Sequence, residues 1–335
     1  MLSIVQVIHS KRGRRVARVD GTRLDILETP STLSLIESTL DRGASLADVI
    51  SQAVSSLQVS YDEVYAGLSD WTLLPPFDHP DEPNRLIVSG TGLTHKASAA
   101  NRQAMHEAQS GNEESLTDSM RMYQWGLEGG TPPDGEIGAQ PEWFYKGLGS
   151  IVRAHGEPLD VPTYADDGGE EPEIAGCYVI DRDGNPRRVG FLQGNEFADH
   201  VMEKKNYLYL APSKLRDCSI GPELVIDAEF GAIKGTVRIE RNGETIWSKV
   251  ISSGNDHTCH SLANMEHHHF KYAAHRRPGD LHLHFYGADG FSFGEGVSLQ
   301  DGDVMVVAWE GMGRALSNPL RVSEETDSLV AISPL

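Results

Sequence analysis

The chain carries two acidic segments, Gly169-Glu170-Glu171-Pro172-Glu173-Ile174 and Gly194-Asn195-Glu196, on either side of its clearest hairpin signal. Between them, the strand-like runs 177–180 and 189–191 are separated by Arg182-Asp183-Gly184-Asn185. An Asp-Gly pair between two strand-like runs is a strong short-range signal for a β-hairpin. We therefore expect the two acidic segments to meet at the open end of one antiparallel hairpin.

The length of the hairpin loop determines which acids oppose each other. A two-residue loop at Asp183-Gly184 places Glu171 opposite Glu196. A four-residue loop at 183–186 instead places Glu173 opposite Glu196. In both registers Glu171, Glu173 and Glu196 project from one face, because side chains alternate along a strand. Opposed pairs would lie about 5 Å apart at Cβ, and diagonal pairs about 7–8 Å.

Three carboxylates on one face repel one another unless a cation neutralises them. Oxygen ligands suit hard divalent cations, so Mg²⁺ is expected, or else Mn²⁺ or Ca²⁺, rather than zinc. Two observations leave other arrangements open. Pro172 cannot donate to a β-ladder, and a one-residue bulge would reverse the direction in which the acids face. On composition alone, a solvated acidic loop shared with Asp166 and Asp167 is the more common arrangement for such a charge run.

The composition limits the possible partners. Among 335 residues, 49 are acidic and 29 basic, so the net charge of −20 argues against a nucleic-acid partner. No run approaches the roughly 18 apolar residues of a membrane-spanning helix, so no membrane partner is expected. The basic cluster at 11–15 follows the first apolar stretch, which is the wrong order for a secretory signal. The three cysteines Cys177, Cys218 and Cys259 form no disulfide framework. We expect a cytoplasmic protein.

Two domains are expected. Residues 1–80 read as a small N-terminal α/β domain that contains two helices, the first ending at Gly43 and the second opening at Ser45. The proline-rich joint at 74–83 marks the boundary, so residues 81–335 form the second domain. In this second domain strand signals dominate from residue 160 onward.

A second candidate metal site is a cluster of histidines late in the chain: His257, Cys259, His260, His267, His268, His269 and His275. It invites a zinc or nickel interpretation, but zinc ligands generally occur as spaced pairs. Three of these histidines are consecutive on a helix predicted from Ser261 to Ala274, so they point in different directions. We expect most of the cluster to serve helix surface, packing or an interface.

The segment Glu171-Pro172-Glu173-Ile174-Ala175, with the strand after it, resembles the E-x-E-L-a-x-V-I strand of the fumarylacetoacetate hydrolase superfamily. In that family the two glutamates bind the catalytic metal, and Asn195-Glu196 occupies the place of the family's Asn-Asp, whose acid is the third ligand. Further matches follow in the family's order over residues 85–322: 85–93, 141–147, 212–214 with 221–223, 278–281, 300–304 and 309–313.

The resemblance implies an α+β, predominantly β fold, in which a mixed β-sheet roll forms the catalytic domain. It also implies a homodimer. The metal ligands would be Glu171, Glu173 and Glu196, and the active-site lysine would be Lys214. The residues expected to contact the substrate are Gly92, Leu93, Lys146 and Tyr286.

The chain departs from the family at three positions that affect the reaction. Ser98 stands where hydrolytic members carry a water-activating histidine, His95 replaces a tyrosine, and His200 replaces an arginine. These changes favour the branch resembling 2-keto-3-deoxy sugar-acid dehydratases, which lack the hydrolytic dyad. Hydrolysis of a C–C bond in an acylpyruvate, or sugar-acid binding without catalysis, are the alternatives.

For dehydration of a 2-keto-3-deoxypentonate, the expected product is 2,5-dioxopentanoate. Lys214 is the first candidate for proton transfer or for binding the substrate carboxylate, with a pKa that burial beside a dication could lower. His95, Ser98 and His200 are the further candidates. The plain alternative for Lys214 is a solvated surface lysine, the usual position of this residue type.

Overall fold

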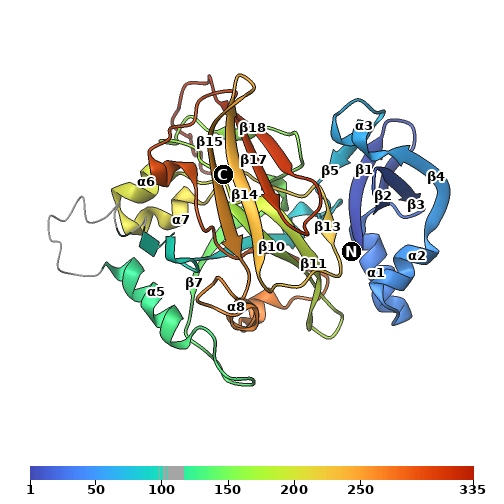
Figure 1. Ribbon diagram of the computed structural model, residues 1–335, viewed down its shortest axis with the longest axis horizontal. Helices are drawn as coiled ribbons and strands as arrows, with labels where there is room; N and C mark the ends of the chain where they lie inside the picture. The colour runs from blue at the N-terminus through green and yellow to red at the C-terminus, as the bar shows by residue number, and fades with distance from the viewer. Residues whose placement is uncertain (98, 101–102, 104–116) are drawn as a thin grey trace.

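The computed structural model describes residues 1–97, 99–100, 103 and 117–335, and two β-sheets dominate it (Figure 1). The larger sheet has the strand order β4 (Val54–Ser60), β3 (Arg23–Leu27), β2 (Gly13–Asp20), β1 (Ser3–His9), β13 (Leu224–Val225), β11 (Pro186–Asn195), β10 (Pro172–Ile180), β16 (Leu281–Phe285), β6 (Leu86–Gly92) and β7 (Glu142–Leu148). Three short strands join it at the side: β5 (Trp71–Leu74), β8 (Val152–Arg153) and β12 (Cys218–Ile220).

The smaller sheet crosses in front of β10 and β11 in the view of Figure 1. Its order is β15 (Glu244–Ser253), β14 (Ile233–Arg241), β17 (Val304–Trp309), β18 (Leu316–Val322) and β9 (Leu159–Val161). Most neighbours are antiparallel, while β16 pairs with β6, β12 with β8, and β18 with β9, in parallel. The predicted α+β fold with predominant, mixed β-sheet is therefore confirmed.

Helices are short and lie at the two ends of the molecule and below the sheets (Figure 1). The α-helices are α1 (Thr32–Arg42), α2 (Leu46–Gln52), α3 (Tyr61–Tyr65), α5 (Asp118–Gly129), α6 (His200–Lys205), α7 (Leu210–Ser213) and α8 (Leu262–Phe270). The 3₁₀ turns are η1 (Pro83–Arg85), η2 (Gly149–Ile151), η3 (Tyr207–Tyr209), η4 (Ala273–His275) and η5 (Ser292–Glu295).

The helix ends predicted in the N-terminal region are confirmed. Gly43 ends α1 in a left-handed conformation with φ 59°, which glycine adopts without steric cost. Ser45 caps α2, because its side chain accepts a hydrogen bond from the backbone N–H of Asp48. The helix predicted from Ser261 to Ala274 begins where expected, with Ser261 as the cap of α8, but it ends at Phe270 and η4 follows.

The N-terminal region shares the large sheet with the rest of the chain. Strand β1 pairs with β13, at Ser3 with Val225 and at Ile4 with Leu224. One hydrophobic cluster contains Ile4 together with Leu192 and Phe285, so both parts contribute to one core. The division into residues 1–80 and 81–335 stays a prediction about how the chain is organised.

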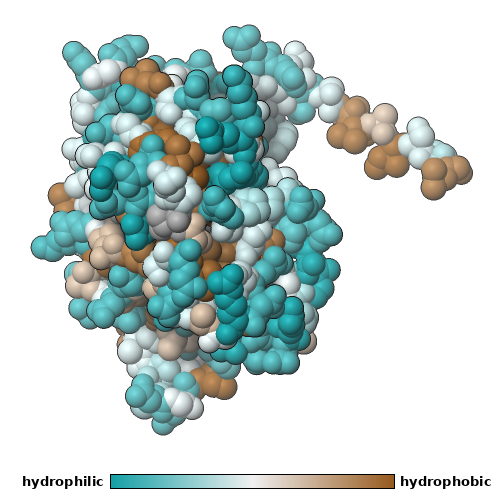
Figure 2. Space-filling model, turned by 90° about the vertical axis from the view of Figure 1, so that its right-hand side faces the viewer, coloured by the Kyte–Doolittle hydropathy of each residue, from teal (hydrophilic) through white to brown (hydrophobic). Residues whose placement is uncertain are grey.

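The surface in Figure 2 is largely hydrophilic, and the C-terminal segment extends away from the body at the upper right. Four apolar side chains of this segment are exposed: Leu329, Val330, Ile332 and Leu335. Within the described part of the chain, no helix has both the length and the apolar character that crossing a bilayer requires.

Candidate metal centre

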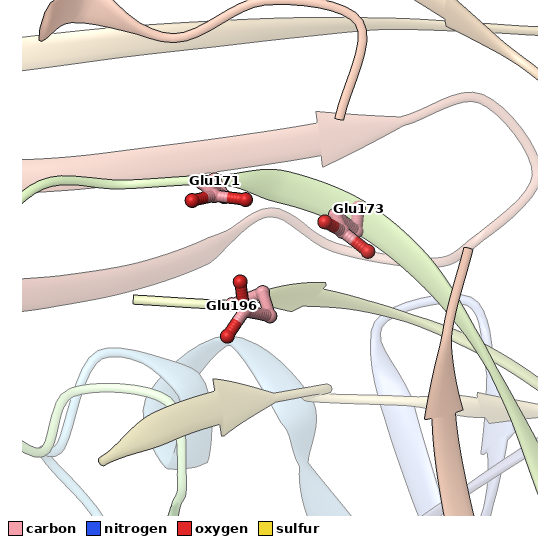
Figure 3. Close-up of side chains that lie close together, drawn as sticks. All are labelled: Glu171, Glu173 and Glu196. Atoms are coloured by element: carbon pink, nitrogen blue, oxygen red, sulfur yellow. The ribbon is translucent and has the colours of Figure 1, made fainter. Parts of the chain in front are cut away.

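The three predicted metal ligands converge in the interior. Glu171 directly precedes β10, Glu173 lies in β10, and Glu196 directly follows β11 (Figure 3). Their side chains are buried, with exposed fractions of 9%, 1% and 0%. One oxygen from each carboxylate lies within 4.8 Å of the oxygens from the other two. The solvated-loop alternative is therefore wrong for these three acids.

The register of the hairpin places Glu171 opposite Glu196, since the Glu196 N–H donates to the Glu171 carbonyl at 2.9 Å. Neither loop length considered from the sequence is correct. The N–H of Asp181 donates to the Asn185 carbonyl, which leaves a three-residue turn between them. The register then shifts between Cys177 and Tyr178.

This shift is a bulge in β11, because Cys177 pairs with Gly190 while Tyr178 pairs with Arg188, leaving Val189 unpaired. A three-residue turn alone would place Asn195 opposite Glu171, and Glu196 would then project from the other face. The bulge adds the one residue that returns Glu196 to the face of Glu171 and Glu173.

Two buried lysines neutralise part of the acid cluster. Lys214 Nζ lies 2.5 Å from Glu171 Oε1 and 2.6 Å from Glu196 Oε2. Lys146 Nζ lies 2.6 Å from Glu196 Oε1 and donates to the Phe197 carbonyl at 2.6 Å. Both lysines are 1% exposed, so the interpretation of Lys214 as a surface lysine is wrong.

The pKa directions show where positive charge is lacking. Burial raises the pKa of Glu173 well above its ordinary value, and the charges of Glu196 and Glu171 raise it further. Burial also opposes ionisation of Glu171, but the positive charge of Lys214 and the contact with His200 lower its pKa overall. Glu173 is thus the acid whose negative charge is least compensated by the protein itself.

A hard divalent cation fits this donor set. The three ligands are carboxylate oxygens, which Mg²⁺, Mn²⁺ and Ca²⁺ prefer, and they converge at distances that one ion can bridge. The cation would supply the positive charge that Glu173 lacks. Among the described residues, no other set of three His, Cys, Asp or Glu side chains brings its ligand atoms together in this way.

Without such an ion, the proton on Lys214 is held firmly. Burial lowers the pKa of Lys214, but the charges of Glu171 and Glu196 outweigh burial and raise it. The lowered pKa expected from the sequence would therefore need the charge of a dication to overcome the two glutamates.

His200, at the start of α6, contacts the metal centre. Its Nε2 lies 3.1 Å from Glu171 Oε1, and its ring stacks on Phe291 at a centroid distance of 4.7 Å. Burial lowers the pKa of His200, but the hydrogen bond and charge of Glu171 raise it overall. His200, which the resemblance aligned with an arginine, is therefore a ring that pairs with the candidate metal ligand Glu171.

The loop after β6 approaches the same region through Gly287. Gly92 ends β6, Leu93 adopts a left-handed conformation with φ 53°, and the Thr94 hydroxyl donates to the Tyr286 carbonyl at 2.8 Å. The N–H of Gly287, the next residue, donates to Glu173 Oε2 at 2.7 Å. Gly92 and Leu93 thus belong to a loop that packs beside one metal ligand, while Ser98 lies outside the described residues.

His95 is a buried neutral imidazole with a defined tautomer. Because the Thr94 hydroxyl gives its hydrogen to Tyr286, the 2.8 Å contact between Thr94 Oγ1 and His95 Nδ1 must use the imidazole N–H as donor. Burial lowers the pKa of His95 to about 4. A hydrogen bond with the Ser252 backbone and the charge of Asp289 act in the opposite direction, but burial is the larger effect.

Tyr286 does not bring its side chain to the metal centre. Its hydroxyl bonds to that of Tyr178, and it lies against Gly176, on the face of β10 opposite Glu173. The role of Tyr286 in binding substrate stays a prediction, and its backbone carbonyl is what faces Thr94.

Glu142 is a buried acid that the sequence analysis missed. Alternation along β7 places Glu142, Phe144 and Lys146 on one face, and all three are buried. Phe144 lies under Lys214 Nζ at 5.0 Å, and Lys146 contacts Glu196. Gly92 pairs with Glu142, and a Cβ there would lie 1.9 Å from Glu142 Oε2. The period-two alternation of residues 142–146 was the signal that could have found it.

The late histidine cluster is divided by the structure. His269 is buried against His282 and His284, two residues of β16 that the sequence analysis did not single out. His269 Nε2 lies 2.9 Å from His282 Nδ1, and Trp143 Nε1 donates to His269 Nδ1 at 3.1 Å. These contacts make a packed polar layer between α8 and the sheet, as expected for packing rather than for a metal site.

Comparisons with known proteins bear on this arrangement. No family model matches the sequence, and no curated protein matches it. Among solved structures, a crystal form of 2-keto-3-deoxyarabinonate dehydratase aligns with a TM-score of 0.70 and 17% identity, over 96% of this chain and 100% of that chain. The chain has the fold of this enzyme.

Two further structures extend the comparison. 2-Keto-3-deoxy-D-arabinonate dehydratase complexed with magnesium and 2,5-dioxopentanoate aligns with a TM-score of 0.69 and 17% identity, over 96% and 100% of the two chains. 2-Hydroxyhepta-2,4-diene-1,7-dioate isomerase from Mycobacterium marinum aligns with a TM-score of 0.59 and 16% identity, over 97% and 100%. The fold expected from the resemblance to the fumarylacetoacetate hydrolase superfamily is confirmed.

Proposed function

We propose that the protein is a Mg²⁺-dependent dehydratase of a 2-keto-3-deoxy sugar acid such as a 2-keto-3-deoxypentonate. The observation that carries this proposal is the buried triad of Glu171, Glu173 and Glu196 beside Lys214. It stands on a fold shared with a dehydratase whose solved structure contains magnesium and 2,5-dioxopentanoate.

Glu171, Glu173 and Glu196 would hold the cation. When bound, the cation supplies Lewis-acid stabilisation of the negative charge that develops on a 2-oxo acid when its C3 proton leaves. The protein's own residues then need to do two things: accept the proton from C3, and donate a proton to the hydroxyl that leaves C4. The C3–H and C4–O bonds break and water leaves, which gives a C3=C4 unsaturated 2-oxo acid that keeps its C5 hydroxyl. Loss of a proton from C5 and gain of one at C3 then give the C4=C5 enol, which tautomerises to the C5 aldehyde of 2,5-dioxopentanoate.

Lys214 is the first candidate for donating the proton to the leaving hydroxyl, because Glu171 and Glu196 keep its amine protonated. His95 is the candidate base, since burial keeps its imidazole neutral and it lies on the loop that contacts the Tyr286-Gly287 backbone beside Glu173. His200 orients Glu171 through their 3.1 Å contact. Glu142 is a second candidate proton donor, because it is a buried acid on the β7 face that it shares with Lys146.

The test is formation of 2,5-dioxopentanoate from isomeric 2-keto-3-deoxypentonates, with and without EDTA. Dehydration that EDTA abolishes and Mg²⁺ restores is the expected result. Release of pyruvate from acylpyruvates without dehydration would instead establish C–C hydrolysis. Sugar-acid binding without turnover of any compound in the panel would establish a binding protein. A homodimer and a cytoplasmic location stay predictions, and light scattering of the purified protein measures the first.

A further inference from the structure

The segment 287–296, between β16 and the end of η5, runs past the metal centre and is called the strap below. At its start, the N–H of Gly287 donates to Glu173 Oε2 at 2.7 Å. Gly287 has φ 93°, and a Cβ at this position would lie 2.0 Å from Thr94 Oγ1. Only glycine fits here, so the first residue of the strap is shaped for close approach to a metal ligand.

The middle of the strap is fastened to Glu170, the residue directly before Glu171. The Ser292 N–H donates to Glu170 Oε1 at 2.6 Å, and the Ser292 hydroxyl donates to Glu170 Oε2 at 2.8 Å. Both side chains are fully buried. One serine therefore satisfies both oxygens of this carboxylate.

The two aromatic residues beside Ser292 contact His200. Phe291 stacks on the His200 ring at 4.7 Å with an interplanar angle of 1°, and Phe293 stacks at 5.1 Å and 21°. His200 in turn contacts Glu171 Oε1. The strap thus reaches Glu173 directly and Glu171 through His200.

Burial of the Glu170 carboxylate is energetically unfavourable. A buried carboxylate loses hydration, and Glu170 adds a fourth acid next to three that already repel one another. An apolar residue would fill the same space at lower electrostatic cost if packing were its only purpose. The two hydrogen bonds of Glu170 go to the strap, and the strap also contacts Glu173. Orientation of the candidate metal ligands would therefore explain why a buried carboxylate is kept at this position.

We propose that Glu170 is a positioning residue that anchors the strap and thereby sets the orientation of Glu171 and Glu173 for metal binding. The proposal rests on the metal centre of the proposed function and adds a determinant of its affinity. Residues that orient metal ligands typically change metal affinity by about 10- to 100-fold when they are replaced.

The experiment measures Mn²⁺ affinity of the full-length chain by electron paramagnetic resonance titration, with Mg²⁺ as competitor. Ser292→Ala and Glu170→Ala are each expected to weaken Mn²⁺ binding by about 10- to 100-fold. Glu170→Gln is the conservative rescue, because its amide can accept from the Ser292 N–H and donate to the Ser292 hydroxyl. The Mn²⁺ affinity of Glu170→Gln is expected to stay within about threefold of the wild type. Because this variant keeps the hydrogen bonds to Ser292 but removes the charge, it separates the effect of anchoring from the effect of charge.

Glu295→Gln is the matched control, since Glu295 lies on the same strap but is exposed and pairs with Lys249 and Trp247 instead. It should leave Mn²⁺ affinity unchanged. Circular dichroism and thermal melting identify any variant that fails to fold. If Glu170→Ala fails to fold, Ser292→Ala still tests the proposal, because it removes only one oxygen atom.

Folded Ser292→Ala protein with wild-type Mn²⁺ affinity would overturn the proposal, as would a Glu170→Gln variant as weak as Ser292→Ala. Wild-type protein that binds no Mn²⁺ would count against the proposed function itself, so the two failures are distinguishable.

Discussion

Nζ of Lys214 lies 2.5 Å from Oε1 of Glu171, so the proposed proton donor is ion-paired with a residue of the candidate metal centre. The same amine lies 2.6 Å from Glu196 Oε2. Lys214 therefore supplies charge that the buried acids need in the absence of a metal ion, and its own protonation depends on the state of those acids.

Replacing Lys214 with methionine separates its two roles. Turnover is expected to fall by about 10²- to 10⁴-fold, the usual contribution of a positioned acid or base. Breaking a buried ion pair also costs about 3–5 kcal/mol, so the metal-free variant should unfold at lower urea concentration. Steady-state kinetics and urea titration measure the two effects. The exposed Lys234→Met variant is the control, and unchanged turnover in Lys214→Met would remove the lysine from the mechanism.

Mg²⁺ is expected to stabilise the wild-type protein but not the Glu173→Gln variant. A ligand at 100 times its Kd stabilises the native state by about 2.7 kcal/mol. Glu173→Gln removes the least compensated negative charge, so its metal-free form should be at least as stable as wild type while losing the response to Mg²⁺. Thermal melting with and without Mg²⁺ measures this. Exposed Glu229→Gln should respond like wild type, and an equal response from Glu173→Gln would exclude Glu173 as a ligand.

The buried histidine layer predicts loss of stability in acid. Burial lowers the pKa of His282 and of His284 to about 3, whereas each has a pKa near 6.5 in the unfolded chain. Below pH 6.5 the unfolded state binds protons that the native state excludes, so the contribution is complete above pH 6.5 and is lost as pH falls towards 3. The slope is about 1.4 kcal/mol per pH unit for each histidine.

Urea unfolding between pH 7.5 and pH 5 checks this for His284→Asn. The slope of its unfolding free energy against pH should be smaller than that of the wild type by about the contribution of one histidine. His284 hydrogen-bonds Ser89 and Thr91, so the variant also loses stability at pH 7.5, and the comparison uses slopes rather than absolute values. His257→Asn, at an exposed position, is the control. A slope for His284→Asn equal to that of wild type would show that this ring is not kept neutral by the fold.

Glu223 is expected to hold the N-terminal region onto the rest of the chain. Its buried carboxylate accepts hydrogen bonds from Ser3 Oγ at 2.6 Å, Tyr61 Oη at 3.0 Å and the Arg314 N–H at 3.0 Å. Glu223→Ala leaves two buried donors and one partly buried donor unsatisfied and should cost roughly 3 kcal/mol. Tyr61→Phe removes one donor and should cost about 1 kcal/mol. Urea titration checks both, and equal stability of Glu223→Ala and wild type would contradict this role.

The positions of the site residues show which parts of the hairpin were predictable. Alternation along strands indicated that Glu171 and Glu173 share a face, and this needs only the local geometry of β10. The match to Glu196 required the register, and neither loop length proposed from the sequence was correct. The bulge at Val189 restored the predicted face. A bulge depends on packing against neighbouring strands, so its position carries no local signal.

Residues that reach the centre from distant parts of the chain were harder to predict. Lys146 and Lys214 were indicated by resemblance, but only the fold shows that both are buried against Glu196. The fold likewise shows that the Tyr286 side chain lies against Tyr178 and Gly176, on the face of β10 opposite Glu173.

The sequence by itself determined the predominance of strands, the helix ends at Gly43 and Ser45, and the identity of three acids able to hold a hard cation. These follow from local backbone preferences, side-chain alternation and the charges of the residues themselves. Only the tertiary structure decided which cations neutralise the acids, which of two faces each side chain occupies, and that Glu170 and Ser292 meet. These contacts join residues that lie from 18 positions apart, for Lys214 and Glu196, to 122 positions apart, for Glu170 and Ser292. Their energies depend on burial that no local stretch of sequence specifies.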